Sequence, residues 1–180
     1  MKKKAVAVVA GACALGMLLS GCGGSGGDSN ASGGANGITA FNSEPQNALI
    51  PGDTNETGGG KVGQLLFANL VRYDSKGDTK MEVADSIEPN KDATQYTVKL
   101  KDGWKFTDGT PVTAESFTKS WSYTANAKNA QKCSSFFSMI KGYDDLQKDG
   151  LKGDEQLEGL KVVDDKTFTV DLAQSDSVFP

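Results

Sequence analysis

The sequence predicts a mixed α/β domain that follows an N-terminal targeting segment. Two patterns indicate the domain. Apolar and polar residues alternate along residues 96–100, as in a strand with one buried face. Residues 117, 121 and 125 are apolar at the spacing of one helix face. The two patterns together favour an α/β fold.

The first 22 residues resemble the export signal of a bacterial lipoprotein. Lys2 to Lys4 precede an apolar run, Ala5 to Leu19, which is shorter than the roughly 20 residues of a membrane-spanning helix. The run ends in Leu19-Ser20-Gly21-Cys22, which resembles the lipobox of bacterial lipoproteins. That resemblance implies a signal peptide over residues 1–21 and a lipid on Cys22. The alternative is an ordinary signal peptide with a chance cysteine.

Residues 22–37 are expected to link the lipid to the domain. After Cys22, this segment contains no apolar side chain larger than alanine and is rich in glycine and serine. Such a segment cannot bury enough surface to offset its chain entropy, so we expect a flexible tether.

The composition argues against several classes of function. The chain has 19 basic and 23 acidic residues, a net charge of −4, and no basic cluster beyond the N-terminus. We therefore expect no nucleic-acid partner. It has no histidine, which removes the usual general base and all His-based metal sites. We expect no catalytic site, no metal and no other cofactor, so binding is the default function.

The folded part is expected to span residues 38–180. Ile38–Phe41 is predicted to be a short strand that ends in a turn-rich segment. Gly58 to Gly60 are predicted to lie in a loop. The apolar residues from Val62 to Leu70 predict a helix that continues into Val71–Tyr73.

A strand and a helix are expected in the middle of the chain. The strand covers residues 96–100, and a second short strand is predicted around Trp104 and Phe106, before a turn at Asp108-Gly109. Thr113 then fits the N-cap of a helix, with Glu115 in the first turn, where a carboxylate complements the helix dipole.

Three further elements are predicted towards the C-terminus. Apolar residues at spacings of three and four predict a helix from about Gln131 to Lys141. The acidic stretch from Asp144 to Glu158 is interpreted as a solvated helix and loop. A β-hairpin is expected from Leu160–Val163 and Thr167–Leu172, joined by a turn at Asp164-Asp165.

Neither the cysteine of the folded part nor the paired acids indicate catalysis. Cys133 lies among apolar residues, and without a histidine to activate it we expect it to fill the core. The pairs Asp144-Asp145 and Asp164-Asp165 are expected in turns, where adjacent carboxylates point apart.

One long motif carries a family resemblance. The run from Lys101 to Glu115, KDGWKFTDGTPVTAE, closely resembles the signature of solute-binding proteins of family 5, which serve ABC importers of peptides and nickel. Phe67–Asp74 and Asp164–Phe168 resemble further stretches of that family, and the similarity covers residues 38–180. The motif itself reads as a strand-to-helix turn and a helix start, so we expect it to mark the fold without touching ligand.

The resemblance implies a periplasmic-binding-protein-like fold of class II, with only the first-lobe portion present in residues 38–180. It implies an extracytoplasmic, lipid-anchored binding protein, and not an enzyme, that captures oligopeptides for an ABC permease and its ATPase subunits. The alternatives are another ligand for the same fold, such as a nickel chelate, a sugar or a signalling peptide, or a surface protein without a transport function.

The resemblance also implies candidate ligand-binding residues. The loop from Asn42 to Gly59 and the segment near Phe136 are expected to face the cleft between two lobes. Glu56 falls near a family position where an acid approaches the ligand, and a carboxylate there would pair with an ammonium or guanidinium group. Asn42, Glu56 and Phe136 are thus the candidates, although the residue pattern favours core positions for Phe136 and Phe137.

Family members are much longer than this chain, which is therefore expected to lack the second lobe. By itself it should bind peptides weakly or not at all, because one side of the ligand would stay in water. Its sheet is also expected to end in an unpaired apolar edge near Phe168 to Leu172, which would favour self-association.

Replacing Cys22 by alanine is predicted to release the protein from membranes, because the thiol is the proposed site of lipid attachment. Fractionation of cells that express wild-type protein or the Cys22→Ala variant, with a carbonate wash, measures this. A variant that still sediments with washed membranes would show that the anchor lies elsewhere.

Overall fold

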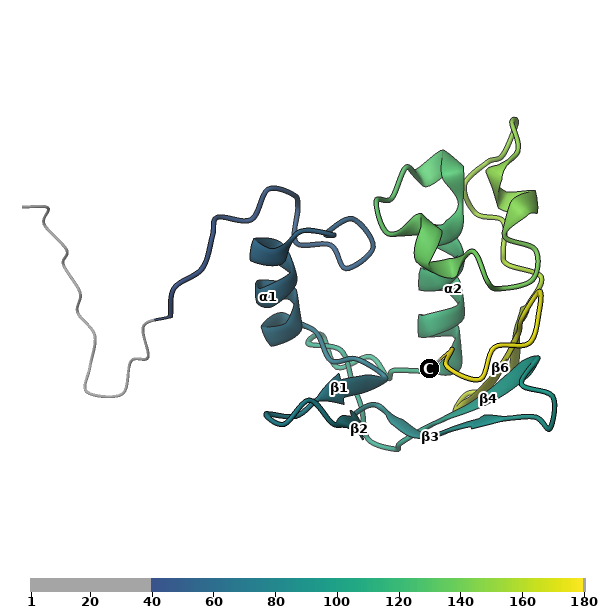
Figure 1. Cartoon of the computed structure of the whole chain (residues 1–180), viewed down its shortest axis with the longest axis horizontal. Coiled ribbons are helices and arrows are strands. Elements are labelled where there is room, and N and C mark those ends of the chain that lie inside the picture. Colours follow the sequence, from purple (N-terminus) through teal and green to yellow (C-terminus); the bar gives the residue numbers. More distant parts are fainter. Residues whose placement is uncertain (1–39, 180) are drawn as a thin grey trace, which may run out of the picture. The chain divides into compact units, whose positions relative to one another are not determined.

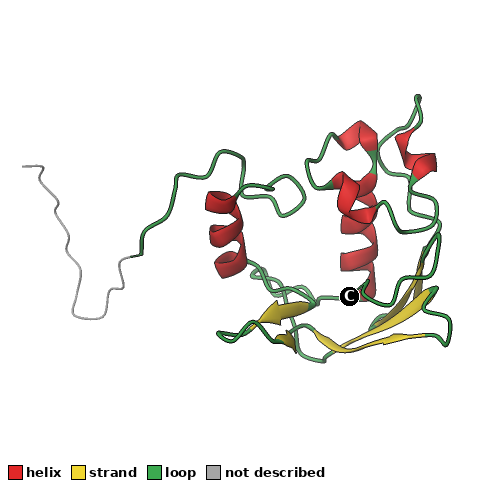
Figure 2. Ribbon diagram, in the orientation of Figure 1, coloured by secondary structure: helices red, strands yellow, loops and turns green. Residues whose placement is uncertain are grey.

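The computed structural model describes residues 40–179 (Figures 1 and 2). This part forms two antiparallel sheets and two α-helices, and the longer helix lies against one face of the larger sheet. None of its helices is long and apolar enough to cross a bilayer. The predicted signal peptide, the lipidated Cys22 and the tether lie outside the described residues.

The larger sheet contains the strand and the hairpin that the sequence predicts. Its four antiparallel strands run in the order β3 (Ala84–Pro89), β4 (Gln95–Leu100), β6 (Thr167–Asp171) and β5 (Leu160–Asp164). Tyr96 faces Val170 and Val98 faces Phe168 in the β4–β6 ladder, so the apolar residues of both strands share one face. All four of these side chains are buried.

The predicted free edge at Phe168 to Leu172 is wrong. Strand β6 lies inside the sheet, because it pairs with β4 on one side and with β5 on the other. Of these two neighbours, β5 is the one at the edge, and its register shifts between Val162 and Asp164. Such an irregularity, together with the charge of Lys161, is a usual protection of an edge strand.

Helix α2 (Ala114–Ala125) covers the apolar face of this sheet, as its residue spacing predicts. The ring of Phe117 stacks on Phe168 with the centroids 6.0 Å apart, and Trp121 meets the same ring edge-on at 5.7 Å. Trp121 also contacts Phe137 at 5.7 Å. These aromatic pairs form the centre of the core and fix α2 on the sheet.

The family-signature motif positions the start of α2. The N–H of Ala114 donates to the Asp165 carbonyl at 2.8 Å, and Lys166 Nζ donates to the Val112 carbonyl at 3.0 Å. The start of the helix is thereby joined to the β5–β6 turn. Gly109 has a φ of +87°, which the predicted Asp108-Gly109 turn requires of a residue without Cβ. The motif is a structural connection, as predicted.

The short strand predicted around Trp104 and Phe106 is not formed. One isolated bridge joins Lys105 to Pro111, and the Phe106 N–H donates to the Thr110 carbonyl. The chain reverses direction directly after Phe106, so the segments on the two sides of the turn are too short to form a β-ladder.

The first helix begins and ends earlier in the sequence than predicted. Helix α1 spans Thr57–Leu66, so it includes the glycines that were expected in a loop and stops before Val71. Phe67 is extended, with φ −117° and ψ 135°, and Val71–Tyr73 form strand β1, which pairs with β2 (Thr79–Met81). Cross-strand pairing thus prevails over the helical spacing of the apolar residues.

The strand predicted over Ile38–Phe41 is absent from Ala40 and Phe41, the two of its residues that the structure describes. Ile38 and Thr39 lie outside the described residues, whereas Ala40 and Phe41 belong to no strand, and Phe41 is 94% exposed. No strand of residues 40–179 pairs with them, and an extended segment without a ladder gains no strand hydrogen bonds.

The prediction of an α-helix over residues 131–141 is also wrong. Within this range the chain forms one short 3₁₀ turn, η2 (Ser134–Phe137), and two further turns flank the range, η1 (Ala127–Asn129) and η3 (Asp144–Gln147). Ile140 forms a bridge with Leu172, and the Lys141 N–H donates to the Asp171 carbonyl at 3.0 Å. The backbone at 140–141 is therefore used to extend the pairing beyond β6, which an α-helix would not allow.

Truncating Trp121 is predicted to destabilise the fold by about 3 kcal/mol, because it removes two aromatic contacts and leaves a cavity beside Phe168. Trp104→Ala should also destabilise it, since Trp104 packs on the same core. Tyr123→Ala is the matched control, because Tyr123 lies on α2 with 51% of its surface exposed. Urea unfolding of the three variants measures the difference, and equal midpoints for Trp121→Ala and Tyr123→Ala would contradict the assignment.

Candidate functional site

The loop that precedes α1, here called the site loop (Asn42–Glu56), carries two of the three predicted ligand-binding residues. Its two ends meet the first turn of α1. Asn42 Nδ2 donates to the Gly58 carbonyl at 2.9 Å, and Glu56 is the N-cap of the helix. Within the loop, Thr54 Oγ1 donates to the Ala48 carbonyl at 2.5 Å. The structure therefore brings Asn42 and Glu56 together at one helix terminus.

The Glu56 carboxylate holds the site loop and the helix together. Both of its oxygens accept the Gly59 N–H at 2.9 Å, and Oε1 also accepts the Gln46 N–H at 3.2 Å. The bond from the Gly59 N–H lowers the pKa of Glu56 below its ordinary value, because it stabilises the charged form. An anion at this position also complements the positive end of the helix dipole.

The site loop is fastened to a segment about 80 residues further along the chain. The Cys133 N–H donates to the Gly52 carbonyl at 3.0 Å, and Lys132 Nζ pairs with Asp53 at 2.9 Å. The bond from Lys132 lowers the pKa of Asp53. Cys133 is buried, as expected of a core thiol, and burial raises its pKa. Sequence reasoning missed Asp53 and Lys132, because no local pattern marks a pair so far apart.

Phe136 lies on η2, in the segment that follows Lys132 and Cys133. It is 71% exposed, whereas its neighbour Phe137 packs against Trp121. The core position predicted for this pair is therefore right for Phe137 and wrong for Phe136. The two side chains differ because consecutive residues of a 3₁₀ turn point in different directions.

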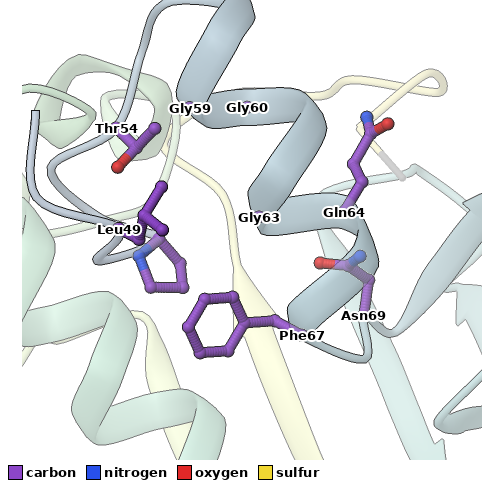
Figure 3. A pocket seen from close by; sticks show the side chains of 9 residues that line it. Leu49, Thr54, Gly59, Gly60, Gly63, Gln64, Phe67 and Asn69 are labelled. Carbon is purple, nitrogen blue, oxygen red and sulfur yellow. The ribbon is translucent and has the colours of Figure 1, made fainter. Parts of the chain in front are cut away.

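A pocket of about 150 Å³ lies between the site loop and α1 (Figure 3). Leu49 and Thr54 from the loop and Phe67 from the end of the helix border it. The helix contributes Gly59, Gly60 and Gly63, whose missing side chains leave the space open. In residues 40–179 no group of three His, Cys, Asp or Glu side chains could hold a metal. The site loop offers hydrogen-bonding groups and the carboxylates of Glu44, Asp53 and Glu56, and the pocket adds apolar surface.

The Glu56 contacts are predicted to weaken in acid. Because its pKa is lowered on folding, the stabilisation is complete above the ordinary value of 4.5 and is lost as the pH falls through the folded-state pKa. The amide NMR shifts of Gly59 and Gln46 should therefore move together on acidification. In Glu56→Gln they should not titrate, while Glu44→Gln in the same loop serves as a control. Unchanged titration in Glu56→Gln would assign the effect to another group.

Sequence comparison relates the chain to proteins that bind solutes outside the cell. Residues 78–180 match the family described as bacterial extracellular solute-binding proteins, family 5 Middle. The oligopeptide-binding protein OppA of Bacillus subtilis is 33% identical over 162 residues, which are 87% of this chain and 29% of that protein.

Solved structures of the same group share the fold. The murein tripeptide-binding protein MppA of Escherichia coli superposes with a TM-score of 0.69 at 27% identity, over 77% of this chain and 27% of that one. OppA of Haemophilus influenzae, in complex with the peptide RPPGFSPFR, gives a TM-score of 0.66 at 26% identity, over 72% and 25% of the two chains.

These relatives are binding proteins, and the chain spans less than a third of the length of each. The mixed α/β fold of residues 40–179 is part of their periplasmic-binding-protein architecture. Together, the match over residues 78–180 and the shared fold show that the chain belongs to the bacterial extracellular solute-binding proteins of family 5.

Proposed function

We propose that the protein is the substrate-binding component of an ABC importer and that it captures oligopeptides outside the cytoplasmic membrane. The observation that carries the proposal is the similarity to an oligopeptide-binding protein along 87% of this chain. A structural neighbour in complex with a nonapeptide supports the same ligand class. The function is proposed for the complete protein, in which a second lobe would enclose the ligand.

The groups in and near the site loop suit a peptide chemically. Asn42 Oδ1 is shielded from solvent and has no hydrogen-bond partner among the described residues, so a peptide N–H that reached it would satisfy an otherwise unpaired acceptor. The Glu56 carboxylate would attract an ammonium or guanidinium group of the ligand. The exposed ring of Phe136 offers an apolar face for a side chain. We propose all three as ligand contacts.

The proposed location follows from the N-terminal sequence. A lipid on Cys22 and the glycine-rich tether of residues 22–37 would keep the domain outside the membrane and close to a permease. The permease and its ATPase subunits are the proposed protein partners, and the membrane is contacted through the lipid. The net charge of −4 gives no reason to propose a nucleic acid as a further partner.

Peptide binding by the complete gene product is the predicted outcome of an unbiased capture experiment. The purified protein is incubated with a mixed peptide library, washed, and the retained peptides are identified by mass spectrometry. Calorimetry with a retained peptide should then give saturable binding, weakened by Glu56→Ala much more than by Glu44→Ala. Glu44 is an exposed acid of the same loop and serves as the matched control.

Other outcomes would overturn the proposal in distinct ways. Retention of no peptide, together with binding of a nickel chelate or a sugar, would keep the family and change the ligand. Peptide binding that is equally unaffected by Glu56→Ala and Glu44→Ala would keep the ligand class and remove Glu56 from the site.

A further inference from the structure

We propose that α1 is a conditional helix, which unfolds locally while the four-stranded sheet and α2 stay folded, and that its folded state is what holds Asn42 and Glu56 in place. The relevance of this switch to ligand capture rests on the proposed function, but the switch itself does not. Four observations lead to it.

The first observation is the composition of α1. Four of its ten residues are glycine, at positions 58, 59, 60 and 63. Glycine has the highest backbone entropy to lose and is the poorest helix former apart from proline. An isolated helix shorter than about 12 residues is marginal in water even with good helix formers. The sequence of α1 therefore opposes the helix that it adopts.

The second observation is the small amount of packing that α1 receives from residues 40–179. In most helices of folded proteins, burial of an apolar face supplies the stability that propensity does not. Gly58 and Gly59 are the buried residues of α1, whereas Leu65 and Leu66 are 87% and 62% exposed. By contrast, α2 buries five residues and contributes Phe117 and Trp121 to the core.

The third observation separates the glycines that packing requires from those that it does not. A Cβ on Gly58 would lie 2.6 Å from the Ser43 carbonyl oxygen, so only glycine fits there. A Cβ on Gly60 or Gly63 would meet no atom within 4 Å, and these two glycines border the open pocket (Figure 3). Packing among the described residues therefore leaves room for a side chain at Gly60 and Gly63, and each of these glycines lowers the stability of the helix relative to alanine.

The fourth observation links the helix to the candidate site. Asn42 is held by the Gly58 carbonyl, and Glu56 by the Gly59 N–H, all within the first turn of α1. The Gln46 N–H also bonds to the same carboxylate. Unwinding this turn would remove the bonds to Gly58 and Gly59 together. The folding of α1 and the order of the two ends of the site loop are thus coupled.

Hydrogen exchange on the ligand-free full chain tests the proposal, because amides in a locally unfolding segment exchange faster than those of the core. The amides of Gly60 and Phe67, both bonded within or at the end of α1, should exchange much faster than those of Val98 and Val170. Gly60→Ala and Gly63→Ala should each slow that exchange about two- to fivefold, as the helix propensities of glycine and alanine differ.

The site loop and a matched control make the test specific. The Gln46 amide should be slowed by the same factor as the α1 amides, since it shares the Glu56 carboxylate with Gly59. Gly58→Ala is the same chemical change at a position without space, and it should speed exchange instead. No slowing in Gly60→Ala and Gly63→Ala, or exchange of α1 as slow as that of Val98, would overturn the proposal.

These readouts need no ligand, so they are independent of the proposed function. Failure of every peptide to bind would overturn the proposed function and leave the exchange result intact.

Discussion

The packing of Phe168 against Phe117 and Trp121 is the interaction on which the rest of the described fold depends. Phe168 has no exposed surface, and its ring receives one stacked and one edge-on partner from α2. Because β6 is an inner strand, this contact fixes the helix relative to β4 and β5 together. Trp121 extends this aromatic cluster to Phe137, whereas the preceding residue, Phe136, is exposed to solvent.

The core and the candidate site are stabilised by different forces. The sheet and α2 are held by burial of large apolar side chains, whereas the site loop and α1 depend on hydrogen bonds at one helix terminus. If the protein binds a ligand and α1 unfolds locally, both as proposed above, this division would let the binding segments move while the scaffold stays rigid. The anchors at Gly52 and Asp53 keep the loop attached to the scaffold if α1 unwinds.

Carboxylates that accept backbone N–H groups organise several loops of residues 40–179, and Glu56 and Glu155 are two of them. Glu56 does so at α1, and Glu155 accepts the N–H groups of Lys152 and Gly153 at 2.8 and 2.9 Å. The bonds from these two N–H groups lower the pKa of Glu155 to about 2. Asn126, which is buried, donates to the same carboxylate. The acidic stretch expected to be a solvated helix and loop thus contains one residue that shapes its own loop.

The sequence by itself determined the elements whose signals are local: the alternation along β4, the capped amphipathic α2, the β5–β6 hairpin and the turn at Gly109. It also determined the family, through a motif that forms one such local connection.

Only the tertiary structure decided that Val71–Tyr73 is a strand, that residues 131–141 form no α-helix, and that the glycines of α1 are helical. In each case a deciding bond comes from a partner that the local pattern does not include: β2 for Val71–Tyr73, Asp171 for Lys141, and the Asn42 side chain for the Gly58 carbonyl. Spacing along a chain records which residues favour burial, but backbone hydrogen bonds go to whichever group the fold brings near.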